Sequence, residues 1–328
     1  MKRYAYWIVV LLASLTTGFS QTANHKHEVV PFAAPPSGQK IWNLARSVAV
    51  DGKGSVIIFR ASEPAVLIYN RAGQLQKAWS LPDGKNVDLA SIKATQLRTA
   101  QEGLYPDAHS VDIDRDGFLW LTERSRHIVY KFTVDGKLVM TLGKDGVAGD
   151  SASTEAFSRP SDVVIGANGD IFVADDGNFR VVKFSRDGRF LQIIGGVKGT
   201  GPGQFGVPHA VDIDSKGRLL VLDQHQDEKG KSRVQIFDQN GKFLEQWKLE
   251  GDQPCGIVIT SDDTVYVSDT NGTSVTVFKN GKVVEMMRDL PIRPHDLAWD
   301  AATSTLYMTE PEGAKERPGG VVLKMTLK

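Results

Sequence analysis

A strand–turn–strand unit recurs six times along this 328-residue chain, and this repetition restricts the fold more than any other feature. In each copy a short apolar segment leads into a turn such as Asp116-Gly117 or Asn168-Gly169, and a second apolar segment follows. Most copies add a third and a fourth apolar segment, so one unit spans roughly 40 to 50 residues. The first segments of the six copies begin at Ser47, Ser110, Asp162, Ala210, Gly256 and Asp296.

Four strands per unit at this period are typical of propeller blades. We therefore expect an all-β fold over residues 41–328, a six-bladed β-propeller of four-stranded antiparallel blades. Helical spacing of apolar residues is confined to residues 87–97, which argues against an α/β fold. The sixth copy lacks a fourth strand, and residues 27–32, in an N-terminal arm over residues 21–40, could supply it and close the ring. Pro31 weakens that pairing, because proline has no amide proton to donate.

The first twenty residues differ in composition from the rest of the chain. Lys2 and Arg3 precede an apolar run over residues 6–15, and Gly18 and Ser20 flank the expected cleavage region. This pattern predicts a signal peptide over residues 1–20, and a periplasmic or extracellular protein that meets the membrane only during export. An uncleaved membrane anchor is the alternative, but the run is short for a span of roughly 20 residues.

The charge balance and the cysteine content limit the possible partners. Lys plus Arg and Asp plus Glu are equal at 39 each, so no basic excess favours nucleic acid. Cys255 is the only cysteine, and an internal disulfide is therefore excluded. We expect a monomer that binds a small molecule or a peptide at the mouth of the central channel.

The residue just before the first strand of each unit is a histidine in some units and a different residue in the others. Histidine occupies this position in units two, four and six, which are 120° apart in a six-fold ring whose first strands line the central channel. Three imidazoles would then converge on one point, an arrangement that suits Zn²⁺ with an open fourth position; copper, iron and nickel remain alternatives. We expect His25, His27 and His127 at the surface. The six residues in unit order are Arg46, His109, Ser161, His209, Cys255 and His295.

The residue that ends each second strand is acidic in units two to six, and an acid there can accept hydrogen bonds from backbone amides of the following turn. Unit one carries Arg60 instead, which either binds a ligand carboxylate at the channel mouth or lies on the surface. Asp296 either contacts a second ion, orients a metal-binding histidine or belongs to a turn. Cys255 is either a small buried apolar residue or a thiolate near the metal. The five acids are Glu123, Asp175, Asp223, Asp269 and Glu310.

Several segments resemble a known family. Gly201-Pro202-Gly203-Gln204-Phe205, followed by Pro208, and the strand over residues 180–184 resemble NHL repeats. Residues 107–114, 203–209 and 293–296 resemble, more narrowly, the lyase domain of peptidylglycine α-amidating enzymes, which are six-bladed NHL propellers with a catalytic zinc and a structural calcium. That family cleaves peptidyl-α-hydroxyglycine into a peptide amide and glyoxylate.

The resemblance implies roles for individual residues. It implies that His109, His209 and His295 bind zinc, that Asp296 binds calcium with backbone carbonyls near Val48 and Val111, and that an active-site arginine lies near Arg60. A catalytic tyrosine of the family has no counterpart in residues 176–179, and Gln224 and His225 stand where its second arginine lies. His225 is then the candidate general base, because the ordinary pKa of histidine suits neutral pH.

Three functions are compatible with these residues. The first is a zinc-dependent lyase acting on peptidyl-α-hydroxyglycine-like substrates. The second is a metal-stabilised propeller that binds a ligand or a protein without catalysis, and the third is another metal-assisted reaction, such as hydrolysis.

Overall fold

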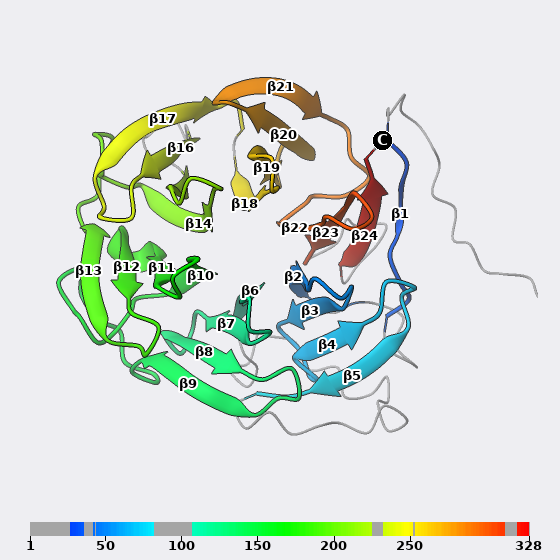
Figure 1. The fold of residues 1–328 in the computed structure, drawn as a ribbon, viewed down its shortest axis with the longest axis horizontal. Coiled ribbons are helices and arrows are strands. Elements are labelled where there is room, and N and C mark those ends of the chain that lie inside the picture. Colours follow the sequence, from blue (N-terminus) through cyan, green and yellow to red (C-terminus); the bar gives the residue numbers. More distant parts are fainter. Residues whose placement is uncertain are drawn as a thin grey trace, which may run out of the picture.

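The chain folds into a ring of six four-stranded antiparallel sheets around a central axis, as the face view shows (Figure 1). The computed structural model describes residues 27–35, 42, 44–81, 107–224, 232–251, 253–311 and 320–327. Within each sheet the strands follow chain order from the axis outward, except that the outermost strand of the sixth sheet comes from the N-terminal segment. The all-β six-bladed propeller expected from the repeats is confirmed.

The first three blades are simple four-stranded meanders. A single 3₁₀ turn, η4 (Asp176–Asn178), joins the second and third strands of blade three. Blade one contains β2 (Ala45–Val50), β3 (Val56–Arg60), β4 (Val66–Tyr69) and β5 (Leu75–Trp79). Blade two contains β6 (Ala108–Ile113), β7 (Leu119–Glu123), β8 (Ile128–Phe132) and β9 (Leu138–Gly143). Blade three contains β10 (Pro160–Ile165), β11 (Ile171–Asp175), β12 (Arg180–Phe184) and β13 (Phe190–Gly195).

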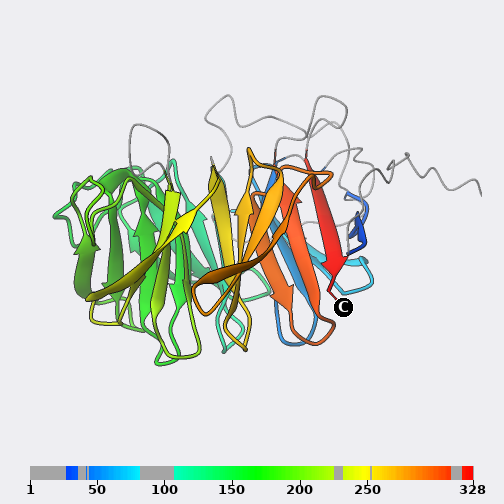
Figure 2. The same ribbon diagram turned by 90° about the horizontal axis from the view of Figure 1, so that it is seen from above.

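The last three blades repeat the same order, and blade six is completed by β1. Blade four contains β14 (Val207–Ile213), β15 (Leu219–Gln224), β16 (Ser232–Phe237) and β17 (Phe243–Leu249). Blade five contains β18 (Pro254–Ile259), β19 (Thr264–Asp269), β20 (Ser274–Lys279) and β21 (Lys282–Met287). Blade six contains β22 (Asp296–Asp300), β23 (Thr305–Glu310), β24 (Val321–Thr326) and β1 (Val29–Pro31). The side view shows the blades standing beside one another, with connecting loops on both faces (Figure 2).

The turns between first and second strands follow directly from the Asp–Gly signals. In blade two the Asp114 carboxylate accepts hydrogen bonds from the amides of Asp116 (3.0 Å) and Phe118 (2.9 Å). Gly117 adopts a φ of 83°, a left-handed conformation that costs glycine least. The Asp–x–x–Gly pattern therefore reverses the chain tightly and fixes the register of the two strands.

The hydrophobic core lies between neighbouring blades. Every residue of β3, β7, β8, β11 and β12 is buried, because each of these strands is covered on both faces by adjacent sheets. Between blades one and two, for example, the rings of Trp79 and Phe132 pack with their centroids 4.9 Å apart. The outer strand β9, by contrast, exposes half of its residues. Burial on both faces explains why the inner strands are continuous apolar runs.

The predicted ring closure is confirmed. β1 pairs antiparallel with β24, with Val29 opposite Met325 and Pro31 opposite Leu323. Pro31 is tolerated because β1 is the outermost strand of its sheet and needs no donor on its outer side. The next residue, Phe32, donates its amide to the Val322 carbonyl (3.0 Å) and packs against aromatic rings of blades one and six.

Other expectations for the N-terminal half have mixed outcomes. His27 is buried, with Nε2 at 3.6 Å from Glu285, so its expected surface position is wrong; the closing strand brings it against blade five. The predicted signal peptide over residues 1–20 and the helical segment over residues 87–97 lie outside the described residues. In the part of the chain that the structure describes, no helix is both long and apolar enough to span a membrane.

Candidate metal centre

A register irregularity at the start of the first strands positions the side chains of the central channel. In blade two, Ala108 pairs with Glu123 and Ser110 with Thr122, so His109 is an extra residue without a partner on β7. The same shift places His209 between Pro208 and Ala210 in blade four. A bulge of this kind re-aims one side chain out of the normal alternation of a strand. The bulge therefore turns His109 and His209 toward the axis, whereas His295 directly precedes the regular strand β22 (Asp296–Asp300).

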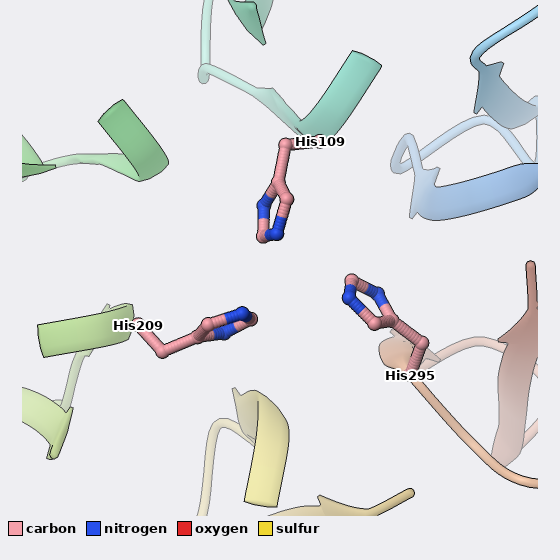
Figure 3. A group of neighbouring side chains, drawn as sticks. All are labelled: His109, His209 and His295. Carbon is pink, nitrogen blue, oxygen red and sulfur yellow. The ribbon is translucent and has the colours of Figure 1, made fainter. Parts of the chain in front are cut away.

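The three predicted histidines meet on that axis. His109, His209 and His295 point toward one another from alternate blades (Figure 3), and their ligand nitrogens lie within 4.8 Å of one another. The ring centroids are 4.8, 5.2 and 5.7 Å apart. A tetrahedral ion with metal–nitrogen distances of about 2.0–2.1 Å holds its ligand nitrogens roughly 3.4 Å apart, so small rotations of the rings would complete the site.

Backbone carbonyls of the intervening blades orient all three rings. The Nδ1 atom lies 2.6 Å from the Ser161 oxygen for His109, 2.9 Å from the Cys255 oxygen for His209, and 3.0 Å from the Arg46 oxygen for His295. A carbonyl oxygen only accepts, so each Nδ1 carries the proton and each Nε2 keeps its lone pair. The nitrogens with free lone pairs are the atoms that could bind a metal ion, and the backbone carbonyls orient them as outer contacts orient the ligands in metalloproteins.

The three imidazoles are neutral, as metal ligands must be. Burial lowers the pKa of His109 and His209 well below 6.5 and that of His295 to about 3, and the charges of Arg46 and Arg124 act in the same direction. Nε2 of His109 is buried without a hydrogen-bond partner. Such an orphaned atom is unfavourable in a dry interior unless it binds something. The donor set and its protonation therefore fit a metal ion.

A cavity of about 180 Å³ opens from the three imidazoles toward one face of the ring. Three arginines and one glutamate are among its described lining residues, so its wall is cationic. The residues that line it besides the histidines are Arg46, Arg124, Gln253, Cys255, Thr270, Arg293, Glu310 and Pro311.

The acids at the ends of the second strands accept hydrogen bonds from backbone amides, but in the described part of the chain only two of them cap the following turn as predicted. Glu123 accepts the amide of Arg126 and Asp269 that of Gly272, both in the turn after the second strand. The acids of blades three, four and six instead accept amides of the segment that leads into the first strand of the same blade.

In blade one the equivalent position is occupied by Arg60, a cation where the other five blades carry an acid. Its side chain is fully buried and donates to the carbonyls of Pro64 (2.7 Å), Glu63 (2.9 Å) and Trp42 (3.4 Å). Arg60 is not among the described residues that line the cavity. The structure therefore does not bring it to the histidines, and its contact with a ligand carboxylate stays a prediction.

Asp296 lies on the other side of the histidines, in a second cavity of about 220 Å³ that Val48 and Val111 also line. Its carboxylate accepts hydrogen bonds from the Ser47 hydroxyl and the Val48 amide (3.1 Å), and burial raises its pKa to about 6. The structure brings together the three residues expected around calcium. The sequence did not reveal that Asp112, Asp162 and Asp212 line the same cavity.

Cys255 is a buried thiol. Its sulfur lies 3.0 Å from the Thr270 hydroxyl and 3.4 Å from the Gln253 carbonyl, and burial raises its pKa to about 11. A thiolate next to the metal is therefore not favoured at neutral pH, and the alternative of a small buried residue fits better. His225, the candidate base, lies outside the described residues.

Comparisons with known proteins agree with this geometry. The NHL repeat family matches residues 157–184. Human NHL repeat-containing protein 3 is 29% identical over 82% of this chain and 77% of its own length. A probable peptidyl-α-hydroxyglycine α-amidating lyase of Caenorhabditis elegans is 30% identical over 65% of this chain and 59% of its own length. The corresponding lyase 1 of Drosophila melanogaster is 30% identical over 66% of this chain and 42% of its own length.

Solved structures support the fold alone. A gluconolactonase from Xanthomonas campestris superposes with a TM-score of 0.60 over 92% of this chain and 90% of its own, at 13% identity. An inactive virginiamycin B lyase from Staphylococcus aureus, solved with quinupristin, superposes with a TM-score of 0.57 over 92% and 99%, at 15% identity. At these identities the likeness extends to the propeller and not to its chemistry.

Proposed function

This chain is an NHL-repeat six-bladed β-propeller that resembles the peptidyl-α-hydroxyglycine α-amidating lyases, and on that premise we propose that it is an exported, metal-dependent lyase. Its substrates are N-acyl-α-hydroxyglycines, and its products are an amide and glyoxylate. The observation that carries the proposal is the convergence of three neutral imidazoles at the base of an open cationic cavity.

His109, His209 and His295 would hold the ion, and zinc is the first candidate because three imidazoles and an open position suit it. A bound Zn²⁺ would supply Lewis acidity toward the α-hydroxyl oxygen of the substrate and lower the pKa of that hydroxyl. The hydrogen bonds from Nδ1 keep the rings in one orientation, so binding requires little reordering of the ligands.

The proposed reaction is an elimination without oxidation. The bond between the α-carbon and the amide nitrogen breaks, the α-hydroxyl becomes the carbonyl of glyoxylate, and one proton moves from the hydroxyl to the departing nitrogen. A protein base must carry that proton. His225 is our candidate from the sequence, and Glu310 is the carboxylate among the described residues that line the cavity.

A second, structural ion is proposed in the channel on the opposite side of the histidines. Asp296, with backbone groups of Val48 and Val111, would hold Ca²⁺, a cation that prefers oxygen ligands. Support comes from the other carboxylates of that cavity, whose mutual repulsion a cation would relieve.

Glyoxylate release from α-hydroxyhippurate tests the lyase directly. The zinc-loaded protein is expected to form glyoxylate, and the His209→Ala variant is expected to form none above background. His127→Ala, which removes a histidine from the turn between β7 and β8 of blade two, is the matched control and should retain activity. Equal rates for the wild-type protein and His209→Ala would refute a role of this centre.

A non-catalytic binding propeller is the second candidate. The match to NHL repeat-containing protein 3 covers more of this chain than the match to the lyases, and residues 176–179 contain no tyrosine. A purified protein that contains metal and is stabilised by hippurate, but forms no glyoxylate, would favour this candidate.

Export and the monomeric state are parts of the proposal with their own tests. N-terminal sequencing of the protein recovered from outside the cytoplasm should begin near Gln21, and light scattering should give the mass of one chain. A cytoplasmic protein that retains residue 1 would refute export.

A further inference from the structure

We propose that Arg46 and Arg124 form a carboxylate-binding site beside the three histidines, and that this site selects ligands with a carboxylate next to a metal-binding oxygen. The inference deepens the proposed lyase function and rests on it for the identity of the substrate. It assigns the carboxylate to these two arginines instead of Arg60, whose guanidinium donates to three backbone carbonyls.

Arg46 holds the position in blade one that the histidines hold in blades two, four and six. It lies in a bulge between Ala45 and Ser47, and its carbonyl oxygen accepts a hydrogen bond from Nδ1 of His295 (3.0 Å). Its side chain therefore starts at the level of the imidazoles. The nearest described acid is Asp107, whose oxygen lies 4.0 Å from the guanidinium, and the buried Nε has no hydrogen-bond partner. Arg46 thus has donor capacity left for a ligand.

Arg124 reaches the cavity from the turn after β7. One terminal nitrogen of its guanidinium pairs with Asp176 of the next blade, which anchors the side chain at one end. Its Nε is also buried without a hydrogen-bond partner. A planar guanidinium that pairs with one carboxylate through one edge can donate hydrogen bonds to a second carboxylate through another.

The charges around the cavity favour an anionic ligand. Arg46, Arg124 and Arg293 line the cavity with Glu310, and two further acids, Asp107 and Asp176, approach Arg46 and Arg124. A divalent ion at the histidines would add two positive charges, and the positive charges would then outnumber these three acids. Repulsion between cations that share a partly desolvated cavity is costly, and an anionic ligand would reverse it.

The geometry also restricts the ligand to one chemical class. A carboxylate offers two coplanar oxygens that match the fork of a guanidinium. The arginines and the histidines line one cavity, so one small ligand can contact both. Ligands that carry a carboxylate and a metal-binding oxygen on adjacent carbons are α-hydroxy and α-oxo carboxylates, including N-acyl-α-hydroxyglycines.

Calorimetric titration of the zinc-loaded protein with hippurate tests the carboxylate site without turnover, since hippurate lacks the α-hydroxyl. We expect Arg46→Met and Arg124→Met each to weaken hippurate binding about 10- to 100-fold, the usual range for losing a charged hydrogen bond. Hippurate methyl ester should bind the wild-type protein as weakly as hippurate binds the variants. Arg186→Met, which removes an exposed arginine paired with Asp116 (2.7 Å), is the matched control and should leave binding unchanged.

Two further measurements separate ligand contact from a structural role. Methylguanidinium should restore part of the hippurate affinity of Arg124→Met, which a merely misfolded variant would not show. The comparison of acid and ester needs no substitution, so it remains decisive if Arg46→Met fails to fold. Equal affinities for acid and ester, or unchanged affinities in both variants, would overturn the inference. Carboxylate binding without glyoxylate release would refute the lyase and leave this site standing.

Discussion

Replacing Asp162 by Asn should change the pH dependence of stability in a predictable direction. Asp162 lies in the cavity below the histidines, where its carboxylate accepts the Ser110 hydroxyl and the amides of Val163 and Val211 (both 2.9 Å). Burial and the neighbouring Asp296 nevertheless raise its pKa from 3.8 to about 8. The folded protein without a bound cation therefore holds a proton here that the unfolded chain releases.

The sign and size of the effect follow from proton linkage. Below about pH 4 the carboxyl is protonated in both states and has no effect on stability. Between pH 4 and 8 only the folded state stays protonated, so folding loses up to about 1.4 kcal/mol for each pH unit of increase. From pH 5 to 7 this amounts to about 2 to 3 kcal/mol, allowing for sharing of protons among the neighbouring carboxyls.

Urea unfolding in the presence of EDTA at pH 5, 6 and 7 measures the effect. The free energy of unfolding of Asp162→Asn, relative to that of the wild-type protein, should rise by about 2 to 3 kcal/mol across this interval. The difference cancels all groups that titrate alike in both proteins. Asp116→Asn, which removes an exposed ion pair, should change stability by less than about 1 kcal/mol at every pH. Parallel curves for wild-type protein and Asp162→Asn would refute the reasoning.

Four further predictions follow from the site and the ring. Millimolar Ca²⁺ should flatten the pH dependence of the wild-type protein, and no change would argue against a cation beside Asp296. His209→Ala should lower bound zinc from about one equivalent per chain to near zero by atomic absorption; retained zinc would contradict the centre. Cys255 should not react with a thiol reagent at pH 8 until urea unfolds the protein, because burial raises its pKa to about 11; rapid reaction would contradict its burial. Phe32→Ala should lower the free energy of unfolding in urea by about 3 to 5 kcal/mol, since the ring centroid of Phe32 lies 5.1 and 5.8 Å from those of two tyrosines. A decrease of less than about 1 kcal/mol would contradict its role in closing the ring of blades.

The fold could be predicted from the sequence because its determinants are local and repeated. The Asp–x–x–Gly turns fix each hairpin, and four apolar segments per unit fix the blade. The histidines could be placed because, in a six-fold ring, equivalent positions of the repeats lie at the same height along the central axis. His109, His209 and His295 meet for that reason, although about one hundred residues separate each from the next.

The remaining features depend on contacts that no repeat predicts. Arg60 was expected at the channel mouth from its position, but carbonyls of the adjacent loop accept hydrogen bonds from its guanidinium. Arg124 could not be found, because its direction is set by Asp176 of the next blade. Arg46 could be recognised from the sequence as a member of the ring. The only signal for its proposed role was its charge, because units three and five carry the small residues Ser161 and Cys255 at the same position.

The hydrogen bonds from Nδ1 of the histidines make the candidate metal centre a property of the whole ring. Blades two, four and six supply the imidazoles, and the carbonyls of blades three, five and one hold them in place. No subset of blades contains a complete site, so loss of one blade would remove either a ligand or its support. A propeller of five or seven such units would also lose the alternation on which the threefold geometry depends. Gain or loss of a blade would therefore disrupt the three-histidine site. Moving the chain ends to another inter-blade loop would leave that site intact.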